Sequence, residues 1–187
     1  MNKVLENLLT RRSIRKYQPK QIKVEELETI LLAGSYAPSG MGMQSWKFTA
    51  IQNELILKEV NQTIRLAILN NQNRYTQSLI EKAADEKINF LYDAPTYVLV
   101  SNLKENSNSM ADSALALGNM MLQAHALGIG SCWLNQLPRL SDTAEMRELL
   151  TKLGIPENHL VYGSIILGYP DEVKEAAKRK DVINIIW

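Results

Sequence analysis

The sequence has few of the residues on which metal sites and disulfide frameworks depend. Its 187 residues include one cysteine, Cys132, and two histidines, His125 and His159. One cysteine cannot form an intrachain disulfide, and it excludes zinc sites that take two or four cysteines from one chain. The two histidines are too far apart for an H-E-x-x-H motif. No metal site is predicted, and a reducing, cytoplasmic setting is expected.

Long apolar runs and an excess of one charge are missing as well. No apolar stretch approaches the length of a bilayer-spanning helix, and the first ten residues lack the pattern of a signal peptide. Lys and Arg number 21 and Asp and Glu number 20, so the formal net charge is only +1. A nucleic-acid binder usually presents a strongly basic face. Neither a membrane nor a nucleic acid is therefore an expected partner.

Several common catalytic and nucleotide-binding motifs are also absent. There is no G-x-S-x-G elbow and no G-x-x-x-x-G-K-[ST] loop, which disfavours serine hydrolases and P-loop proteins. The stretch "GIGSCW" begins like a dinucleotide fingerprint, but Trp133 replaces its third glycine and it follows a helical pattern instead of a strand. Cys132 has no plausible histidine partner and is interpreted as a small buried residue. His125 is interpreted as a core or boundary histidine.

What is present is typical of a folded chain. Hydrophobic residues make up 45% and charged residues 22%, close to the averages of globular proteins. A chain of this length can bury a sizeable core. Because no linker, repeat or low-complexity tract divides it, residues 1–187 are predicted to form a single domain.

Apolar spacing predicts helices first, with strands scattered among them, which is the pattern of an α+β fold. A short helix near residues 4–9, one closing near Gly34 and two pieces between about 54 and 92 are expected. The helix after Ser109, apolar nearly all round, should be the buried central helix, with Ser109 and Asp112 as a capping box. A further helix is expected at 143–154. The predicted strands are 46–52, 94–102, 129–134, 160–170 and a last, strongly β-prone segment at 181–187.

The segment at residues 181–187 needs a partner, because an exposed apolar strand invites association. It either pairs with its own sheet or exchanges with a second subunit. The residues alone leave both possibilities open.

Two stretches are candidates for ligand binding, the first for a small anion and the second for a flat ligand. "RRSIRKY" concentrates guanidinium groups, which bind phosphate bidentately, around a serine hydroxyl that adds a donor. One phosphomonoester is a possible ligand there, and a solvated basic loop is an equal alternative. "PSGMGMQSW" offers glycines that let backbone N–H groups approach a flat ligand, and Gln44 offers an amide. By itself, that second stretch is better explained as an ordinary turn.

Taken in order, these stretches resemble the nitroreductase family of FMN-dependent oxidoreductases over essentially the whole chain. Each is weak, but the combination is specific. The resemblance implies an α+β fold with a central, mainly antiparallel sheet flanked by helices. It also implies an intertwined homodimer with exchanged C-terminal strands and two FMN sites at the interface. The stretches are "RRSIRKY", "YAPSGMGMQSWKF", "DAPTYVLV", "HALGIGSCWL", "ILGYPDE" and "KRKDVINIIW".

The resemblance also implies roles for individual residues. The run 11–13 would bind the phosphate and ribityl chain, helped by a late arginine, and Arg15 would reach the pyrimidine edge as an electrostatic stabiliser. The loop 38–40 would come from the other subunit, and no side chain would be an acid–base catalyst. Gly42 and Ser45 depart from the family's usual Asn and Pro. The implied cofactor-binding residues are Arg11, Arg12, Ser13, Arg15, Pro38, Ser39, Gly40, Gln44, Gly130, Ser131 and Arg179.

The activity that the resemblance implies is hydride transfer from NADH or NADPH, through flavin N5, to an oxidised small-molecule acceptor such as a nitroaromatic or a quinone. A ping-pong cycle is expected. Other flavin chemistry, such as dehalogenation or flavin destruction, is an alternative within the family. A non-catalytic flavin-binding or sensing protein is the alternative from another class. A basic-arm nucleic-acid binder, which would be colourless, has weaker support.

Overall fold

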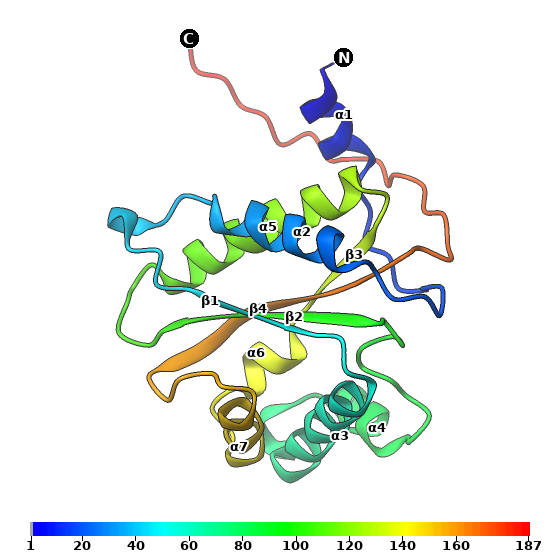
Figure 1. Ribbon diagram of the computed structural model, residues 1–187, viewed down its shortest axis with the longest axis vertical. Helices are drawn as coiled ribbons and strands as arrows, with labels where there is room; N and C mark the ends of the chain where they lie inside the picture. Colours follow the sequence, from blue (N-terminus) through cyan, green and yellow to red (C-terminus); the bar gives the residue numbers. More distant parts are fainter. Residues whose placement is uncertain (1) are drawn as a thin grey trace.

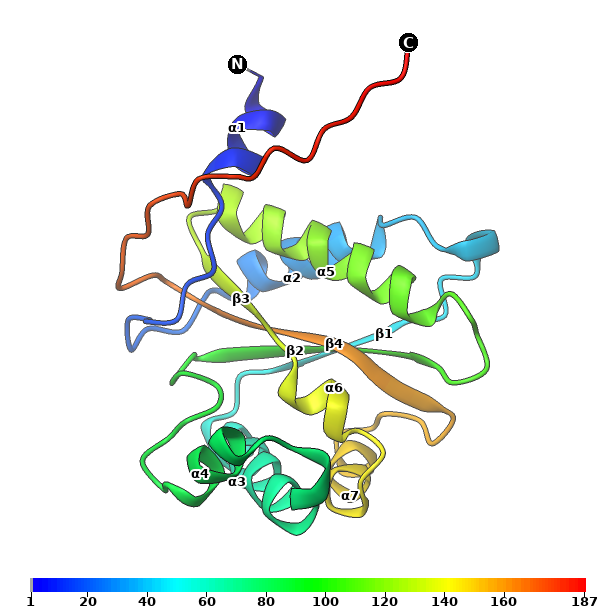
Figure 2. The ribbon, with the colours of Figure 1, turned by 180° about the vertical axis from the view of Figure 1, so that it is seen from behind.

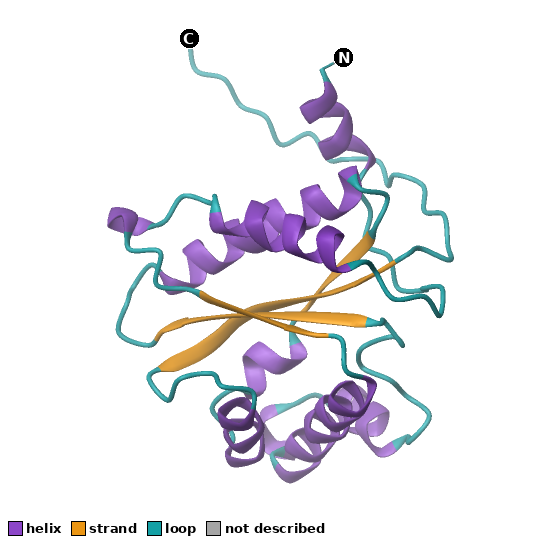
Figure 3. Ribbon diagram, viewed as in Figure 1, coloured by secondary structure: helices purple, strands orange, loops and turns teal. Residues whose placement is uncertain are grey.

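A four-stranded sheet forms the centre of the molecule. The computed structural model describes residues 2–187. The strands are arranged in the order β1-β2-β4-β3, and every neighbouring pair is antiparallel. The predicted α+β fold with a mainly antiparallel sheet is therefore confirmed (Figure 3). The strands are β1 (Lys47–Ile51), β2 (Thr96–Leu103), β3 (Gly130–Leu134) and β4 (His159–Gly168).

Helices cover both faces of this sheet (Figures 1 and 2). One face carries α2 (Val24–Ser35) and α5 (Ser109–Ala126), and the other carries the remaining large helices. The predicted break near "NNQNR" is confirmed, because a short η2 (Gln72–Arg74) separates α3 from α4. The second layer consists of α3 (Glu54–Asn70), α4 (Gln77–Ala84), α6 (Gln136–Leu140) and α7 (Ala144–Lys152); α1 (Lys3–Thr10) and η1 (Gly40–Gly42) lie at the periphery.

Alternate residues of β2 belong to two different hydrophobic cores. Val98 and Val100 pack with the α2–α5 layer, whereas Tyr97 and Leu99 pack with the layer of α3, α6 and α7. Side chains of a strand point alternately to its two faces. Because both faces are buried, the strand has a continuous apolar sequence instead of an alternating one.

The capping box predicted for α5 is wrong. The N-cap residue is Asn108, and it makes no side-chain cap hydrogen bond. The Ser109 hydroxyl donates instead to the carbonyl oxygen of Leu103 at 2.7 Å. Asp112 Oδ1 accepts a hydrogen bond from the backbone N–H of Gly40 at 2.9 Å. Both side chains are thus occupied by partners that only the tertiary structure brings near.

Exposed apolar side chains on three segments bear on the predictions. The helix α5 is not buried all round, since Met110 and Leu115 are 64% and 48% exposed. The helix α1 has no buried residue. The strand predicted at 181–187 is not formed, because the chain leaves the sheet near Pro170 and extends outward near α1 (Figures 1 and 2). The exposed apolar residues of the two terminal segments are Val4, Leu5, Leu8, Leu9, Val182, Ile183, Ile185, Ile186 and Trp187.

Two further observations apply to residues 2–187. No helix there is both long and apolar enough to cross a membrane. No three His, Cys, Asp or Glu side chains gather there in a way that could hold a metal ion.

The buried His159 should make the fold less stable at mildly acidic pH. Its Nδ1 lies 3.2 Å from Ser101 Oγ. Burial, followed by the charges of Lys47 and Arg147, lowers its pKa. Because the folded pKa is below the unfolded value of about 6.5, this stability is complete above that pH and is lost as the pH falls further. We expect Tm to fall between pH 8 and pH 5.5, and to fall less in His159→Gln. Equal falls in the two proteins would contradict this assignment.

Candidate functional site

The segment 11–18 lies against the start of β3. The backbone N–H of Ile14 donates to the carbonyl oxygen of Ser131 at 3.0 Å, and Ser13 forms a parallel β-bridge with Ser131. A Cβ on Gly130 would approach the Ile14 side chain to 2.9 Å. The glycine in "GIGSCW" is therefore needed for this close approach, which carries the arginine cluster onto the edge of the sheet.

A pocket of about 260 Å³ opens between this segment and β3. Four predicted site residues, Arg11, Arg12, Gly130 and Ser131, line it. Arg11 Nη1 and Ser131 Oγ are buried there and have no hydrogen-bond partner among the described residues. Buried polar atoms are normally paired. These two atoms therefore indicate a ligand with hydrogen-bond acceptors.

Arg11 and Arg12 are not equivalent. Arg12 Nη1 donates to the carbonyl oxygens of Leu9 and Arg11, at 2.7 Å each, and so binds the C-terminal end of α1. Arg11 Nη1 has no such partner in the described chain. Arg12 Nε is also buried without a partner, but Arg12 Nη1 is already engaged, so Arg11 is the better placed of the two to bind an anion.

Residues without a predicted site role also line the pocket, among them His125, Glu172 and Lys174. Lys174 Nζ lies 3.2 Å from Glu172 Oε1. His125 Nε2 lies 2.8 Å from Thr10 Oγ1, which confirms it as a boundary histidine. Burial, and then the charges of the two neighbouring arginines, lower the pKa of His125. Glu172 lies in "ILGYPDE", one of the stretches that resemble the nitroreductase family, but the resemblance did not imply a site role for it.

Arg15 lies outside the pocket. Its backbone N–H donates to Glu172 Oε1 at 2.5 Å, which is the main cause of the lowered pKa of Glu172. Its guanidinium carbon lies 6.0 Å from the centre of the Tyr92 ring, at the outer limit of a cation–π contact. The carboxylate of Glu172 thus links the backbone of the segment 11–18 to the part of the chain that follows β4.

The predicted loop residues Pro38, Ser39, Gly40 and Gln44 are far from this pocket in one chain. Gly40 is bonded to Asp112 in the first turn of α5, whereas His125 in the last turn of α5 lines the pocket. A helix rises 1.5 Å per residue, so about 20 Å separates these two positions. A single chain does not bring the two halves of the predicted site together.

The two departures from the family pattern have local explanations. Gly42 has φ of 66°, a left-handed conformation that Asn also adopts more readily than most residues. The Ser45 hydroxyl donates to Asn102 Oδ1 at 2.7 Å and accepts from Asn106 Nδ2 at 3.2 Å. Gly42 thus has a backbone conformation that Asn also tolerates, and hydrogen bonds hold the loop at Ser45.

Arg179 is not brought to the pocket. It is exposed, in a segment without helix or strand, and makes no hydrogen bond or ion pair within residues 2–187. Lys174, earlier in the same segment, does line the pocket, where it is paired with Glu172.

Comparison with known proteins places these features in a family. The Nitroreductase family model matches residues 8–169. A crystal structure of a nitroreductase with bound FMN from Bacteroides fragilis is 43% identical, covers 100% of both chains and has a TM-score of 0.95. An Archaeoglobus fulgidus protein named "Putative NADH dehydrogenase/NAD(P)H nitroreductase" is 34% identical over 98% of this chain and 95% of its own. An iodotyrosine deiodinase of Thermotoga neapolitana is 26% identical, with coverage of 92% and 91%. The chain belongs to the nitroreductase family.

Proposed function

We propose that residues 1–187 form one FMN-binding domain of an oxidoreductase that moves hydride from NADH or NADPH to an oxidised small-molecule acceptor. A nitroaromatic or a quinone is the expected acceptor. The main observation in support is the pocket beside β3, where Arg11 Nη1 and Ser131 Oγ are buried without partners. The FMN bound by the 43% identical relative supports the same choice of ligand.

The donor set of the pocket fits a phosphate group. A phosphate oxygen accepts strong hydrogen bonds from guanidinium and hydroxyl groups, and the unpartnered donors of the lining residues, Arg11 Nη1, Arg12 Nε and Ser131 Oγ, are of these kinds. In this proposal the phosphate and ribityl chain are bound by Arg11, Arg12 and Ser13, with Arg179 returning from the C-terminal segment. Gly130 and Ser131 present backbone groups to the ring, and Arg15 stabilises negative charge that develops there.

We further propose that the working form is an intertwined homodimer. The loop residues Pro38, Ser39, Gly40 and Gln44 would then complete the site of the second subunit. Two observations support this. In one chain, about 20 Å of α5 keeps the loop from the pocket. The apolar residues of α1 and of the segment 181–187 are exposed, and a second copy exchanging the latter would bury them.

When bound, FMN would supply a group that accepts hydride from the nicotinamide nucleotide and then donates it to the acceptor, so ping-pong kinetics are expected. The protein's own residues bind and orient, and none is proposed as an acid or base. Cys132 is buried and its pKa is raised, which keeps it a neutral thiol.

Two alternatives predict different behaviour. A flavin-binding sensor would have the same pocket but no turnover. Dehalogenation is the alternative suggested by the iodotyrosine deiodinase relative.

The absorption spectrum of the purified protein, FMN release on denaturation and NADH or NADPH oxidation test the proposal together. We expect a yellow protein that releases FMN and turns over with menadione or a nitroaromatic. Bound FMN without turnover on any of these acceptors would favour the sensor, and turnover only with 3-iodotyrosine would favour dehalogenation. A colourless protein with no affinity for added FMN would overturn the proposal.

A further inference from the structure

A second pocket, of about 270 Å³, lies between α4 and α6. Its walls combine a few apolar side chains with hydroxyl, amide and cationic groups. No predicted site residue lines it. The polar residues used below are Tyr75, Ser78, Lys82, Asn135, Gln136 and Arg139.

Each of the two helices places one cation at the α4–α6 pocket, Lys82 on α4 and Arg139 on α6. Ser78 and Lys82 are four residues apart, as are Asn135 and Arg139, and residues at that spacing share one helix face. Lys82 and Arg139 therefore face the same pocket from opposite walls.

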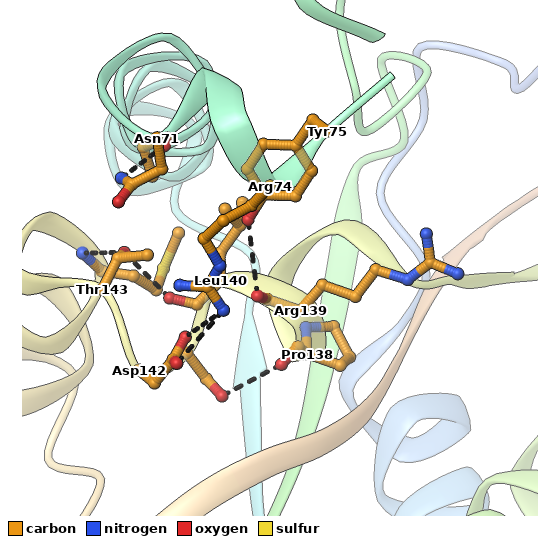
Figure 4. A network of polar contacts seen from close by, with 11 residues as sticks. Asn71, Arg74, Tyr75, Pro138, Arg139, Leu140, Asp142 and Thr143 are labelled. Carbon is orange, nitrogen blue, oxygen red and sulfur yellow. Dashed lines mark hydrogen bonds and ion pairs between the residues drawn. The ribbon is translucent and has the colours of Figure 1, made fainter.

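These two cations have no carboxylate partner. The ion pairs of the described chain involve other residues: Lys58–Glu54, Arg74–Asp142, Lys152–Glu59 and Lys174–Glu172. Asp142, the acid near this wall, is bound by Arg74 at 3.2 Å, and the Arg139 side chain extends away from that pair (Figure 4). The pocket consequently presents two uncompensated positive charges.

An unpartnered polar atom also marks the α4–α6 pocket. Gln136 Oε1 is buried and accepts no hydrogen bond within residues 2–187. An unpaired buried acceptor is unfavourable. It therefore indicates a hydrogen-bond donor here, and a water that donates both to Gln136 Oε1 and to a bound anion would supply it.

The position of the α4–α6 pocket relates it to the proposed flavin site. Asn135 and Gln136 directly follow β3, while Gly130 and Ser131, its first residues, line the arginine pocket. The two pockets thus lie at opposite ends of one five-residue strand, about 17 Å long. Because segment 11–15 runs parallel to β3, the backbone of Arg15 lies farther along β3 than that of Arg11, in the direction of the second pocket.

We propose that the α4–α6 pocket binds the carboxylate of an aromatic acceptor, with Lys82 and Arg139 as the anion-binding residues that determine specificity. This rests on the proposed function, since it assigns the chemical class of the acceptor in that proposed reaction. A phosphate of NADPH has related chemistry, and the experiment distinguishes the two.

Equilibrium binding of 4-nitrobenzoate and of uncharged 4-nitrobenzyl alcohol, measured by calorimetry without a reductant, tests the proposal. Two exposed charges should together contribute roughly tenfold in affinity. We expect the double variant Lys82→Gln, Arg139→Gln to bind 4-nitrobenzoate roughly tenfold more weakly and the alcohol unchanged. Lys87→Gln, an exposed lysine outside the pocket, is the matched control and should change neither. Tm and FMN content should match wild type in all variants.

Four results would overturn the assignment: no measurable 4-nitrobenzoate binding by wild type, equal losses for both ligands, no loss for either, or a raised KM for NADPH but not for NADH. In each case a yellow protein with normal turnover would leave the proposed function standing. Conversely, charge-dependent 4-nitrobenzoate binding by a protein with no affinity for added FMN would overturn the proposed function and the acceptor role together, leaving an anion site.

Discussion

Replacing Arg11 by glutamine is expected to weaken FMN binding by roughly 10- to 150-fold and to leave riboflavin binding nearly unchanged. A hydrogen bond from a charged donor contributes about 1.5–3 kcal/mol, and every 1.4 kcal/mol is about tenfold in affinity. Arg11 Nη1 is a buried, unpartnered donor of the pocket. Riboflavin has no phosphate for it to bind. Quenching of flavin fluorescence by the apoprotein measures both dissociation constants.

Arg15→Ala is the informative control for this prediction. In the proposed site Arg15 addresses the ring, which FMN and riboflavin share. We therefore expect Arg15→Ala to weaken the two ligands to a similar extent or to slow NAD(P)H oxidation. Equal losses of FMN and riboflavin in the Arg11 variant would contradict the phosphate role, and unchanged flavin content and turnover in Arg15→Ala would contradict the ring role.

Replacing Arg65 by methionine is expected to lower the free energy of unfolding by about 3–5 kcal/mol. Arg65, in α3, is 6% exposed and has no carboxylate partner within residues 2–187. Its guanidinium instead binds the carbonyl oxygens of Ala83 and Asp85 at 2.6 Å each, and those of Ile88 at 2.8 Å and Glu86 at 3.4 Å. Methionine fills the space but leaves these carbonyls without a donor.

For a chain of this size the loss corresponds to a Tm lower by about 6–20 °C. Urea unfolding at one fixed protein concentration measures the change directly. Arg74→Met is the matched control, because Arg74 forms an exposed pair with Asp142 (Figure 4) and such pairs contribute at most about 1 kcal/mol. A loss in Arg65→Met no larger than in this control would show that the loop carbonyls are satisfied in another way.

Local patterns predicted most of the helices and strands. The apolar run of β2 and the break at "NNQNR" were identified because each depends on neighbouring residues alone. The capping box was not, because the Ser109 hydroxyl and the Asp112 carboxylate found partners at Leu103 and Gly40 that local sequence does not reveal. Short polar side chains such as Ser and Asp form hydrogen bonds with whichever donor or acceptor the fold brings closest.

Some residues of the candidate site could likewise be recognised in the sequence, and others could not. The cluster at 11–15 was recognisable because several cations around one serine are unusual in a nearly neutral chain. His125 and Lys174 gave no such signal, since each is a single residue whose role depends on being near the arginines. The cations of the α4–α6 pocket, Lys82 and Arg139, are likewise unremarkable in sequence and meet only in the fold.

By itself, the sequence determined the fold class, the family resemblance and the arginine cluster with its phosphate chemistry, because these depend on composition and on short-range order along the chain. Only the tertiary structure decided that Arg12, and not Arg11, donates hydrogen bonds to the end of α1, and that the loop at 38–44 is about 20 Å of helix away from the pocket. These are facts of long-range packing. Each depends on where the fold places segments that are distant in sequence, either side by side along one strand or at opposite ends of one helix.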